Sequence, residues 1–540
     1  MRLLLAFCLV AIAAAQEDHS QHQHAVAGVG KVDLRTSCNA VAQRSISLGV
    51  ALLHSFGYEE ARIAFRAAAD ADPVCGMAYW GIARSWYHPV WPAPTEDELK
   101  EGAQAMARAS ATRAKTAREL DYIASLSVFY RDWPSVDHAT RAKNYERALA
   151  EVANRYPDDD EAAIFHALQL VAIGYLDPAD KSYAWQKSGS EILNRLLPSH
   201  PDHPGVAHYI IHADDYPALA ELGLKAARAY AAIAPDSPHA LHMPSHIFTR
   251  LGLWDDSIAS NIASAKSAVA QTERLHGGGG SFDQLHAMDY LVYAYLQEAR
   301  DRSAEGVLAE MDRMNRVDES QFAAAYALAA SPARWALERH DWRAAAHLKA
   351  LPAWFPWARF RNIEALHHYA KAIGAARAGD PAAARREADE LALIRKGLPQ
   401  TRDYDWSGSI ATQCETVAAL IRWAEGSKDE GIQMLRAAAD YEDSVDKHPV
   451  TPGPLLPARE MLADILLDAG SAPEALREYE AVLKTSPRRF NATAGAGKAA
   501  ERSGDRSKAR AYAIQLLGLA AKAEGSRPEL EWARAYLALK

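Results

Sequence analysis

Long apolar segments are missing from this 540-residue chain after its first fifteen residues. A transmembrane helix needs about 20 consecutive apolar residues, so the rest of the chain does not predict a membrane span. The start, MRLLLAFCLVAIAAA, combines one arginine, a short apolar run and an Ala-x-Ala ending. This pattern predicts a cleavable signal peptide over residues 1–15. We therefore expect an exported protein, periplasmic or secreted, with no membrane insertion after cleavage.

Clustered basic residues are also missing. The net charge is -9, and the lysines and arginines are scattered along the chain. Surfaces that bind nucleic acid carry a basic patch or stripe, so no nucleic-acid partner is expected. The sequence has no Gly-rich phosphate loop and no C-x-x-C-H, so neither a nucleotide nor a covalent haem is expected. It also has no H-E-x-x-H and no G-x-S-x-G, so motifs leave open whether the protein is an enzyme.

Cysteine is scarce, with four in the whole chain and one of these, Cys8, inside the predicted signal peptide. Cys38, Cys75 and Cys414 remain after cleavage. In an oxidising compartment a pair of cysteines is expected to form a disulfide. Cys38 precedes the first predicted helix and Cys75 follows the second, and the two ends of a helical hairpin lie close together. We predict a Cys38–Cys75 disulfide and a free Cys414.

Strand signals are scarce as well, whereas apolar residues recur at helical spacing almost throughout. Short anchor patterns repeat with a period of 34 residues, which is the tetratricopeptide length. Ala61, Phe65, Ala68 and Pro73 fit the second half of one such repeat, and segments after residue 460 fit whole repeats. The predicted fold class is all-α: an α-solenoid of tetratricopeptide-like helical hairpins, superhelical and with a concave groove.

We predict the domain organisation from the segments in which the 34-residue repeat pattern is present. Residues 16–35, which include QEDHSQHQHAVAG, are expected to be a disordered, histidine-bearing leader. A glycine run at 277–280 and a proline-broken aromatic segment at 351–360 interrupt the repeats. We therefore expect an N-terminal repeat block over residues 36–310 and a C-terminal repeat block over residues 311–540.

Several blocks carry a resemblance to a known family: TSCNAVAQ, ALLHSFGYEEA, DPVCGMAYWGIA, HYIIHADD and LHMPSHIFTRLG. With these blocks the chain resembles bacterial tetratricopeptide-repeat (TPR) proteins. More narrowly, it resembles an exported group of them with paired-histidine (HxxxH) repeat blocks. The narrower resemblance covers about residues 36–265. It implies a helical solenoid and no particular activity.

One stretch is written twice, as PDHPGVAHYIIH at residues 201–212 and as PDSPHALHMPSH at residues 235–246. The offset is again 34 residues, and it repeats two histidines in each copy: His208 and His212, then His242 and His246. Residues four apart share one face of a helix. We therefore expect four imidazoles to converge from two adjacent repeats.

Four converging imidazoles suit a divalent transition metal such as zinc, copper or iron. Two other interpretations stay open: a polar lining for a ligand groove, and hydrogen-bonded packing between repeats of common descent. Pro244 lies between His242 and His246 and must interrupt the hydrogen bonding of their helix. Either the helix kinks there and re-aims His246, or it begins there and leaves His242 in the loop.

Polar residues near the duplicated stretch are candidates for groups that support a metal or line a groove. The carboxylates that follow the first pair could orient an imidazole or pair with Arg250, and the helix after the glycine run carries a further histidine and tyrosine four residues apart. The candidates are Asp214, Asp215, Arg250, His286, Asp289, Tyr290 and His54.

The sequence thus supports two functions. In the first, paired histidines of the N-terminal block bind a divalent transition metal, with metal-dependent catalysis if one coordination position stays open. In the second, the protein is a non-enzymatic scaffold that holds a peptide or protein partner in its concave groove. The second is favoured by thirteen tryptophans and by aromatic segments such as WYHPVWPAP.

Overall fold

The computed structural model describes residues 28–112, 116–398 and 404–538. Within these ranges every regular element is a helix, and the one β-type pairing is an isolated bridge between Gly280 and Val317. The expected signal peptide and residues 16–27 of the expected leader lie outside the described residues. Among the helices described, none is long and apolar enough to cross a membrane.

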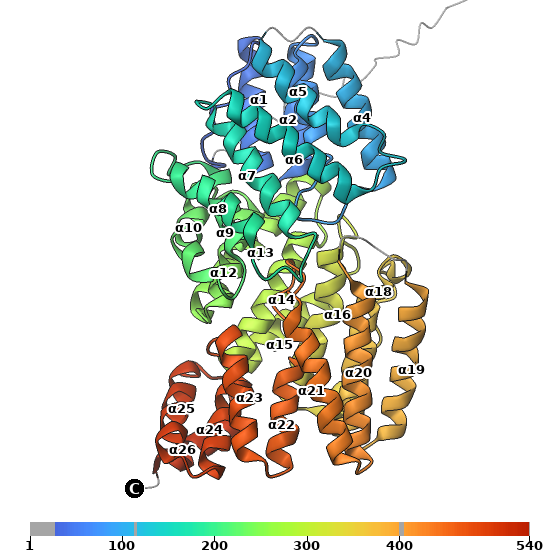
Figure 1. Cartoon of the computed structure of the whole chain (residues 1–540), viewed down its shortest axis with the longest axis vertical. Helices are drawn as coiled ribbons and strands as arrows, with labels where there is room; N and C mark the ends of the chain where they lie inside the picture. The colour runs from blue at the N-terminus through green and yellow to red at the C-terminus, as the bar shows by residue number, and fades with distance from the viewer. Residues whose placement is uncertain (1–27, 113–115, 399–403, 539–540) are drawn as a thin grey trace, which may run out of the picture.

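The helices up to residue 276 form the upper part of the molecule in Figure 1, and the next two, up to residue 311, lie at mid-height. They are α1 (Ala40–His54), α2 (Tyr58–Ala71), α3 (Gly76–Arg84), α4 (Glu96–Ala111), α5 (Ala117–Tyr130), α6 (His138–Arg155), α7 (Asp160–Gly174), α8 (Ala184–Leu196), α9 (Pro204–Asp214), α10 (Ala220–Ile233), α11 (Pro238–His242), α12 (Pro244–Arg250), α13 (Trp254–His276), α14 (Phe282–Gln297) and α15 (Asp301–Met311).

The remaining helices form the lower part of the same view, coloured from yellow to red. They are α16 (Phe322–Leu337), α17 (Trp342–Ala346), the 3-10 helix η2 (Trp357–Arg359), α18 (Arg361–Arg377), α19 (Pro381–Gly397), α20 (Trp406–Ala424), α21 (Lys428–Ser444), α22 (Ala458–Asp468), α23 (Ala472–Thr485), α24 (Phe490–Arg502), α25 (Arg506–Leu519) and α26 (Pro528–Ala538).

Consecutive helices pack as hairpins, and each hairpin packs on the next. Pairs such as α1 with α2, α9 with α10, α22 with α23 and α24 with α25 each bury a shared apolar face. This is the architecture of an α-solenoid of TPR-like hairpins, as the period of 34 predicted. Its core is a chain of interfaces between neighbours rather than one central core.

The superhelix is closed by contacts between its last repeats and the helices in the middle of the chain. A third apolar cluster joins residues 254–304 to residues 490–533. Polar contacts follow the same interface: the Trp254 indole donates to the Arg488 carbonyl at 3.0 Å, and Ser303 donates to Glu524 at 2.7 Å. The helices near the C-terminus therefore pack against α13, α14 and α15.

Residues 28–35 correct the expectation that the whole leader, 16–35, is disordered. Lys31 donates its backbone N–H to the Asp202 carbonyl at 3.0 Å, and Leu34 is only 1% exposed. The Asp33 N–H donates to the buried Glu161 carboxylate at 3.1 Å. Backbone N–H groups of this segment bond to α7 and to the loop before α9, and these contacts with distant residues cannot be read from its composition.

The structure joins Cys38 and Cys75, the pair that the sequence suggested, and Cys414 is free and half-buried. The cross-link holds the residue before α1 against the residue before α3, with Cα atoms 5.3 Å apart. The α1–α2 hairpin that it closes carries His54 at the end of α1. It therefore fixes one wall of the histidine site described below.

Replacing Cys38 and Cys75 together by serine is expected to lower the free energy of unfolding by about 3 kcal/mol. The cross-link spans 37 residues, and without it the unfolded chain regains the entropy of that loop. Urea denaturation followed by circular dichroism measures the difference. Cys414→Ser is the control and should shift stability by less than about 1 kcal/mol. A double variant as stable as the parent would show that the hairpin does not need the bond.

Candidate metal centre

The first group of histidines combines both members of the first predicted pair with one that the repeat did not flag. His208 and His212 lie on α9, and His239 lies in the first turn of α11. One ring nitrogen from each lies within 4.8 Å of the other two, and all three side chains are buried. The Nε2 atoms of His208 and His239 are 3.1 Å apart. We call this set the first triad.

The second group combines both members of the second predicted pair with a histidine from a later helix. His242 ends α11, His246 lies on α12 and His286 lies on α14. Their ligand nitrogens also lie within 4.8 Å of one another, and His286 is the most exposed of the three at 8%. The Nε2 atoms of His242 and His246 are 3.0 Å apart. We call this set the second triad.

The two triads are neighbours. The ring centroids of His212 and His246 are 6.4 Å apart, and so are those of His239 and His242. The four histidines expected to converge therefore divide between two adjacent groups, and each group gains a third imidazole. Together they form a six-histidine cluster between α9, α11, α12 and α14.

Pro244 produces this division. Hydrogen bonding is interrupted between α11 and α12, but Met243 keeps helical dihedrals, with φ -53° and ψ -36°. His242 thus remains helical and His246 starts the next helix, which is the kinked alternative of the two that the sequence left open. The kink turns His242 and His246 toward each other, so that their rings meet edge to face with an interplanar angle of 85°.

The first pair is placed by the close approach of α9 to α1. A Cβ atom on Gly205 would lie 2.5 Å from the His54 ring, so glycine is needed at this position. The last carbonyls of a helix have no partner within it. One of these, the His54 carbonyl, accepts a hydrogen bond of 2.6 Å from His208 Nδ1. Because a carbonyl can only accept, Nδ1 of His208 carries the proton and Nε2 presents its lone pair.

Hydrogen-bond partners also determine the protonation of His242 and His246, whose Nε2 atoms face each other in the second triad. His246 Nδ1 donates to the Asp215 carboxylate at 2.9 Å. His242 Nδ1 donates to the Asn261 Oδ1 atom at 2.6 Å, and Asn261 is oriented because its amide NH₂ donates to the Ser257 carbonyl at 2.8 Å. Both Nε2 atoms therefore present lone pairs to each other at 3.0 Å. Two lone pairs repel unless a cation lies between them.

A proton is a poor candidate for that cation. Burial lowers the pKa of His208 to about 3 and lowers the pKa of His246, while burial together with neighbouring imidazoles holds the pKa of His242 and of His286 well below the ordinary value. In the first triad, burial and the other rings act in the same direction on His212 and His239. The cluster is therefore a set of neutral imidazoles near neutral pH.

A transition-metal ion fits where a proton does not. Metal–imidazole bonds of about 2.0–2.1 Å place two ligand nitrogens about 3.3–3.6 Å apart. In each triad one pair of nitrogens is slightly closer than this, at 3.1 and 3.0 Å, and the third nitrogen lies within 4.8 Å of both. In the first triad, His212 Nε2 is buried and has no hydrogen-bond partner among the described residues. Ligand histidines in proteins are commonly oriented through a hydrogen bond from their second nitrogen, as His208, His242 and His246 are here.

Of the three candidate carboxylates, Asp215 contacts a histidine of the cluster, whereas Asp214 and Asp289 do not. Asp215 contacts His246 and is itself held by Arg250 at 2.8 Å and by Lys447 at 3.5 Å. Burial opposes ionisation of Asp215, but the charges of Lys447 and Arg250 hold its pKa well below the usual range. Asp214 instead faces Ser190, and Asp289 faces Ser331 and Arg334.

Aromatic side chains enclose the cluster. The Tyr290 hydroxyl lies 3.3 Å from His246 Nδ1 and 3.4 Å from His246 Nε2, so it borders the second triad. Phe56 stacks on His212 and on His239, with ring centroids 5.4 and 5.3 Å apart. These contacts leave a site of low polarity around the imidazoles, in which a bound ion is shielded from bulk water.

A third group, His54 with Glu161 and His203, also has its ligand atoms close together. Here both nitrogens of His54 and one nitrogen of His203 already have partners: His54 Nδ1 contacts the Tyr209 hydroxyl at 2.8 Å, and His54 Nε2 contacts Glu161 at 2.9 Å. His203 Nε2 contacts the other oxygen of Glu161 at 3.0 Å. We interpret this group as a hydrogen-bonded network that anchors α1 to α7, so His54 supports the cluster only through its backbone carbonyl.

Asn261 should act as a positioning residue for the second triad only. Asn261→Ala removes the acceptor for His242 Nδ1, and loss of such partners typically weakens metal binding by about 10–100-fold. Titration of the metal-free protein should show a weaker second binding step and an unchanged first. Asn194→Ala is a matched control, because Asn194 makes the same amide bond to a carbonyl four residues back but contacts no histidine of the cluster. Equal weakening by both variants would point to a general loss of structure.

Comparisons with known proteins give matches in structure only. No family model matches the chain, and no curated protein matches it. Among solved structures, the chain is similar to Naa15/Naa10 bound to HypK-THB, with 12% identity, 92% of this chain and 91% of that chain covered, and a TM-score of 0.24.

Two structures of the human IFIT1 dimer are similar in the same way. With m7Gppp-AAAA, the identity is 13%, the coverage 90% of this chain and 92% of that chain, and the TM-score 0.38. With PPP-AAAA, the identity is 12%, the coverage 90% and 92%, and the TM-score 0.36.

Proposed function

We propose that this protein binds two transition-metal ions, one in each triad of the six-histidine cluster. The observation that carries the proposal is the pair of Nε2 lone pairs of His242 and His246, which face each other at 3.0 Å in a buried site. Their tautomers follow from acceptors that cannot donate. A cation relieves the repulsion, and the low pKa values of these histidines disfavour a proton in that place.

The donor set narrows the identity of the ions. Both triads consist of neutral imidazoles, and no carboxylate is among their ligand atoms. Iron pairs in helical proteins are held mainly by glutamates, and manganese prefers oxygen ligands. Imidazole suits copper and zinc, and copper has the highest affinity of the divalent first-row ions. Copper and zinc are therefore favoured over iron.

Each ion would have three protein ligands. A structural zinc site is usually closed by four protein ligands, whereas three leave a position for water or a substrate. Two such open positions side by side favour a centre that binds or transforms a small exogenous ligand. Asp215, held by Arg250 and Lys447, orients His246, and the Tyr290 hydroxyl borders the second triad.

Metal analysis of the full chain, expressed without an affinity tag, tests the proposal. The metal-free protein is titrated with Cu(I) or Zn²⁺, and two equivalents should bind tightly. A variant in which the leader residues His19, His22 and His24 are replaced by alanine removes loose binding outside the cluster. Two tight equivalents in this variant support the proposal, whereas uptake that disappears with the leader histidines contradicts it.

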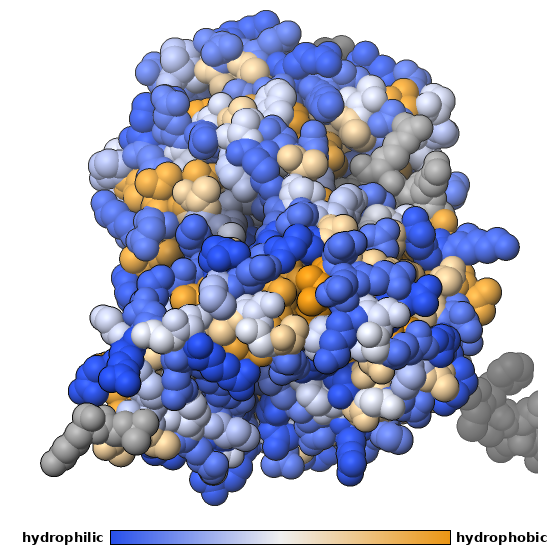
Figure 2. Space-filling model, turned by 60° about the horizontal axis from the view of Figure 1, so that its bottom comes forward, coloured by the Kyte–Doolittle hydropathy of each residue, from blue (hydrophilic) through white to orange (hydrophobic). Residues whose placement is uncertain are grey.

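A second candidate function rests on a separate observation. A cavity of about 600 Å³ lies between the two blocks and is lined by aromatic side chains that include Tyr183, Tyr326, Tyr369 and Trp406. Such a groove suits an extended peptide or a small organic ligand. Figure 2 shows apolar residues gathered across the middle of one face of the molecule, between hydrophilic surfaces. Groove binding and metal binding are compatible in one protein.

Export is part of the proposal as well. The disulfide between Cys38 and Cys75 suits an oxidising compartment, and the first fifteen residues resemble a cleavable signal. Amino-terminal sequencing of protein recovered from a secreting host should begin at Gln16. Protein that retains Met1 would contradict export by this signal.

A further inference from the structure

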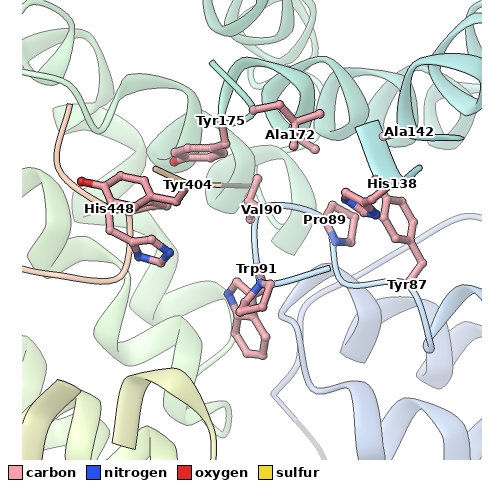
Figure 3. Close-up of a pocket in the computed structure, with 13 residues that line it drawn as sticks. Tyr87, Pro89, Val90, Trp91, His138, Ala142, Ala172, Tyr175, Tyr404 and His448 are labelled. Atoms are coloured by element: carbon pink, nitrogen blue, oxygen red, sulfur yellow. The ribbon is translucent and has the colours of Figure 1, made fainter. Parts of the chain in front are cut away.

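A small pocket lies beside the first triad. Loop residues between α3 and α4, the end of α7 and the loop 445–457 between α21 and α22 line it, with Trp91, Tyr175, Tyr404 and His448 among its walls. Figure 3 shows Tyr404 and His448 at one end, Tyr87 and His138 at the other, and Trp91 and Tyr175 on opposite sides. We call it the aromatic pocket.

Two walls of the aromatic pocket contact the first triad directly. The Trp91 ring packs edge to face on His239, with ring centroids 5.7 Å apart. The Tyr175 hydroxyl donates to the His212 carbonyl at 2.9 Å and lies 3.5 Å from His212 Nδ1. One side chain therefore separates a molecule in this pocket from the triad on either side.

The size and lining of the aromatic pocket select its occupant. Its volume is about 50 Å³, enough for a few atoms of the size of water but small for an aromatic ring. Val90, Pro89, Pro92, Ala172 and Leu176 contribute apolar lining beside the aromatic rings, and His138 and His448 add polar atoms. Among the described residues that line the pocket there is no Asp, Glu, Lys or Arg, so a small neutral molecule fits it better than an ion. Dioxygen is neutral and fits the size.

The charge of the cluster selects the metal. Asp215 is the carboxylate in contact with the six histidines, and it is already paired with Arg250 and Lys447. Two divalent ions would bring four positive charges into a buried site where the described residues supply no unpaired carboxylate in contact with the histidines, whereas two Cu(I) ions bring two. Because burying uncompensated charge is costly, the site favours copper in its monovalent state.

We propose that the six-histidine cluster holds a pair of copper ions that reduces dioxygen admitted through the aromatic pocket. Each Cu(I) gives one electron and becomes Cu(II), and the dioxygen takes both electrons and is reduced to the level of peroxide. While it is held between the ions, its two negative charges offset the two positive charges that the copper ions gain. A small donor that supplies two electrons and two protons then returns both ions to Cu(I) and releases hydrogen peroxide. This inference rests on the proposed function, which supplies the two bound ions.

The larger groove is where such a donor approaches. Tyr404 and His448 line both the aromatic pocket and the cavity of about 600 Å³, so they form the wall between the two spaces. The groove carries many aromatic side chains, which suits a flat aromatic donor. A donor in the groove would therefore lie next to the aromatic pocket, across Tyr404 and His448.

Single-turnover measurements on the full chain test this inference. Protein loaded with two Cu(I) ions without oxygen is mixed with oxygenated buffer, and uptake of one dioxygen per two copper ions is expected. Two neighbouring Cu(II) ions bridged by one ligand couple magnetically, so the product should give little or no electron paramagnetic resonance signal. No uptake, or a signal that accounts for all the copper as isolated ions, would overturn the inference.

Filling the aromatic pocket supplies a variant that leaves the ligands alone. Ala172→Leu should slow dioxygen uptake by about tenfold or more, with both copper ions retained. Ala163→Leu on the same helix is the control, since Ala163 is half-buried and does not line the pocket. If Ala172→Leu does not fold, Leu176→Phe fills the same space. An unchanged rate in a folded, copper-loaded pocket variant would contradict entry by this route.

The copper count keeps the two proposals apart. Two bound copper ions without dioxygen uptake would leave the proposed metal binding standing and remove the dioxygen chemistry. Loss of metal binding would remove both. Catechol and ascorbate serve as probe donors: sustained uptake of dioxygen with stoichiometric oxidation of either one supports turnover, and a single uptake that neither donor renews contradicts it.

Discussion

Replacing His242 and His246 together by alanine is expected to lower the tightly bound metal from two ions to one. These residues provide two of the three ligands of the second triad, and His286 alone cannot hold an ion tightly. The first triad keeps all its ligands, because His208, His212 and His239 are oriented by contacts with α1, Tyr175 and one another. Replacing His208 and His239 should give the reciprocal result.

The control for these double variants is a histidine that is equally buried but outside the cluster. His203 belongs to the hydrogen-bonded group around Glu161, and His203→Ala should retain both ions even if it lowers stability. Metal content by elemental analysis, with circular dichroism to confirm folding, distinguishes the variants. Both ions lost together in each double variant would mean that the triads form a single site, and both retained would mean that neither is a site.

Replacing Arg489 by methionine is expected to destabilise the protein by about 3–5 kcal/mol. Arg489 is 1% exposed and lies between two buried carboxylates, donating to Glu460 at 2.6 and 2.8 Å and pairing with Glu338 at 2.8 Å. It also donates to the Tyr293 hydroxyl at 3.2 Å. Removing the guanidinium leaves two buried carboxyl groups without their shared partner in the interface where the last repeats pack on α14.

The loss of stability caused by Arg489→Met should be larger at higher pH. Burial raises the pKa of Glu460 to about 7, against the opposing effect of Arg489, so loss of Arg489 raises it further. A carboxyl group with a raised pKa in the folded state binds its proton there more tightly than in the unfolded chain, so stability is lost as pH rises. Urea denaturation at pH 5 and pH 8 should give the larger loss at pH 8. A loss that is the same at both values would show that the carboxylates find other partners.

Arg436→Met is the matched control for this charge removal. Arg436 also contacts two carboxylates, Glu474 and Glu478, but it lies at the surface with its side chain 38% exposed. Exposed ion pairs contribute about 0–1 kcal/mol because water solvates the separated charges well. A similar loss in both variants would mean that burial at Arg489 does not determine the effect.

The fold was predictable because TPR-like packing is local. Each hairpin buries its apolar face against its neighbours, so anchors such as Ala61 and Phe65 report the packing directly. Closure of the superhelix was not predictable in the same way. The contact of Trp254 with Arg488 joins residues 234 positions apart, and no repeated pattern links those two segments.

The candidate site was predictable only where the repeat was copied faithfully. His239 was missed because the residue 34 positions earlier is Gly205, which must be glycine to pass His54. The two copies of the duplicated stretch thus differ at this position: the first has Gly205, which leaves room for the His54 ring, and the second has His239, which belongs to the first triad. His286 was found as a neighbouring candidate, whereas Asn261 and Lys447 come from segments with no sequence link to the histidines.

Spacing also assigned some carboxylates to the wrong surroundings. Asp215 does orient His246, but its neighbour Asp214 turns to Ser190 because adjacent residues at a helix end point in different directions. Asp289 lies in α14 with His286, yet its carboxylate meets Arg334 of α16. Sequence spacing predicts on which face of a helix a side chain lies. The residue that it contacts depends on which other helix packs against that face.

The location of bound metal tests the central claim most directly. Crystals of the copper-loaded protein, measured at wavelengths on either side of the copper absorption edge, give an anomalous difference map that places each ion. We expect two peaks, one between His208, His212 and His239 and the other between His242, His246 and His286. Peaks elsewhere, or a map with none at the six-histidine cluster, would contradict the proposal that these histidines form a metal centre.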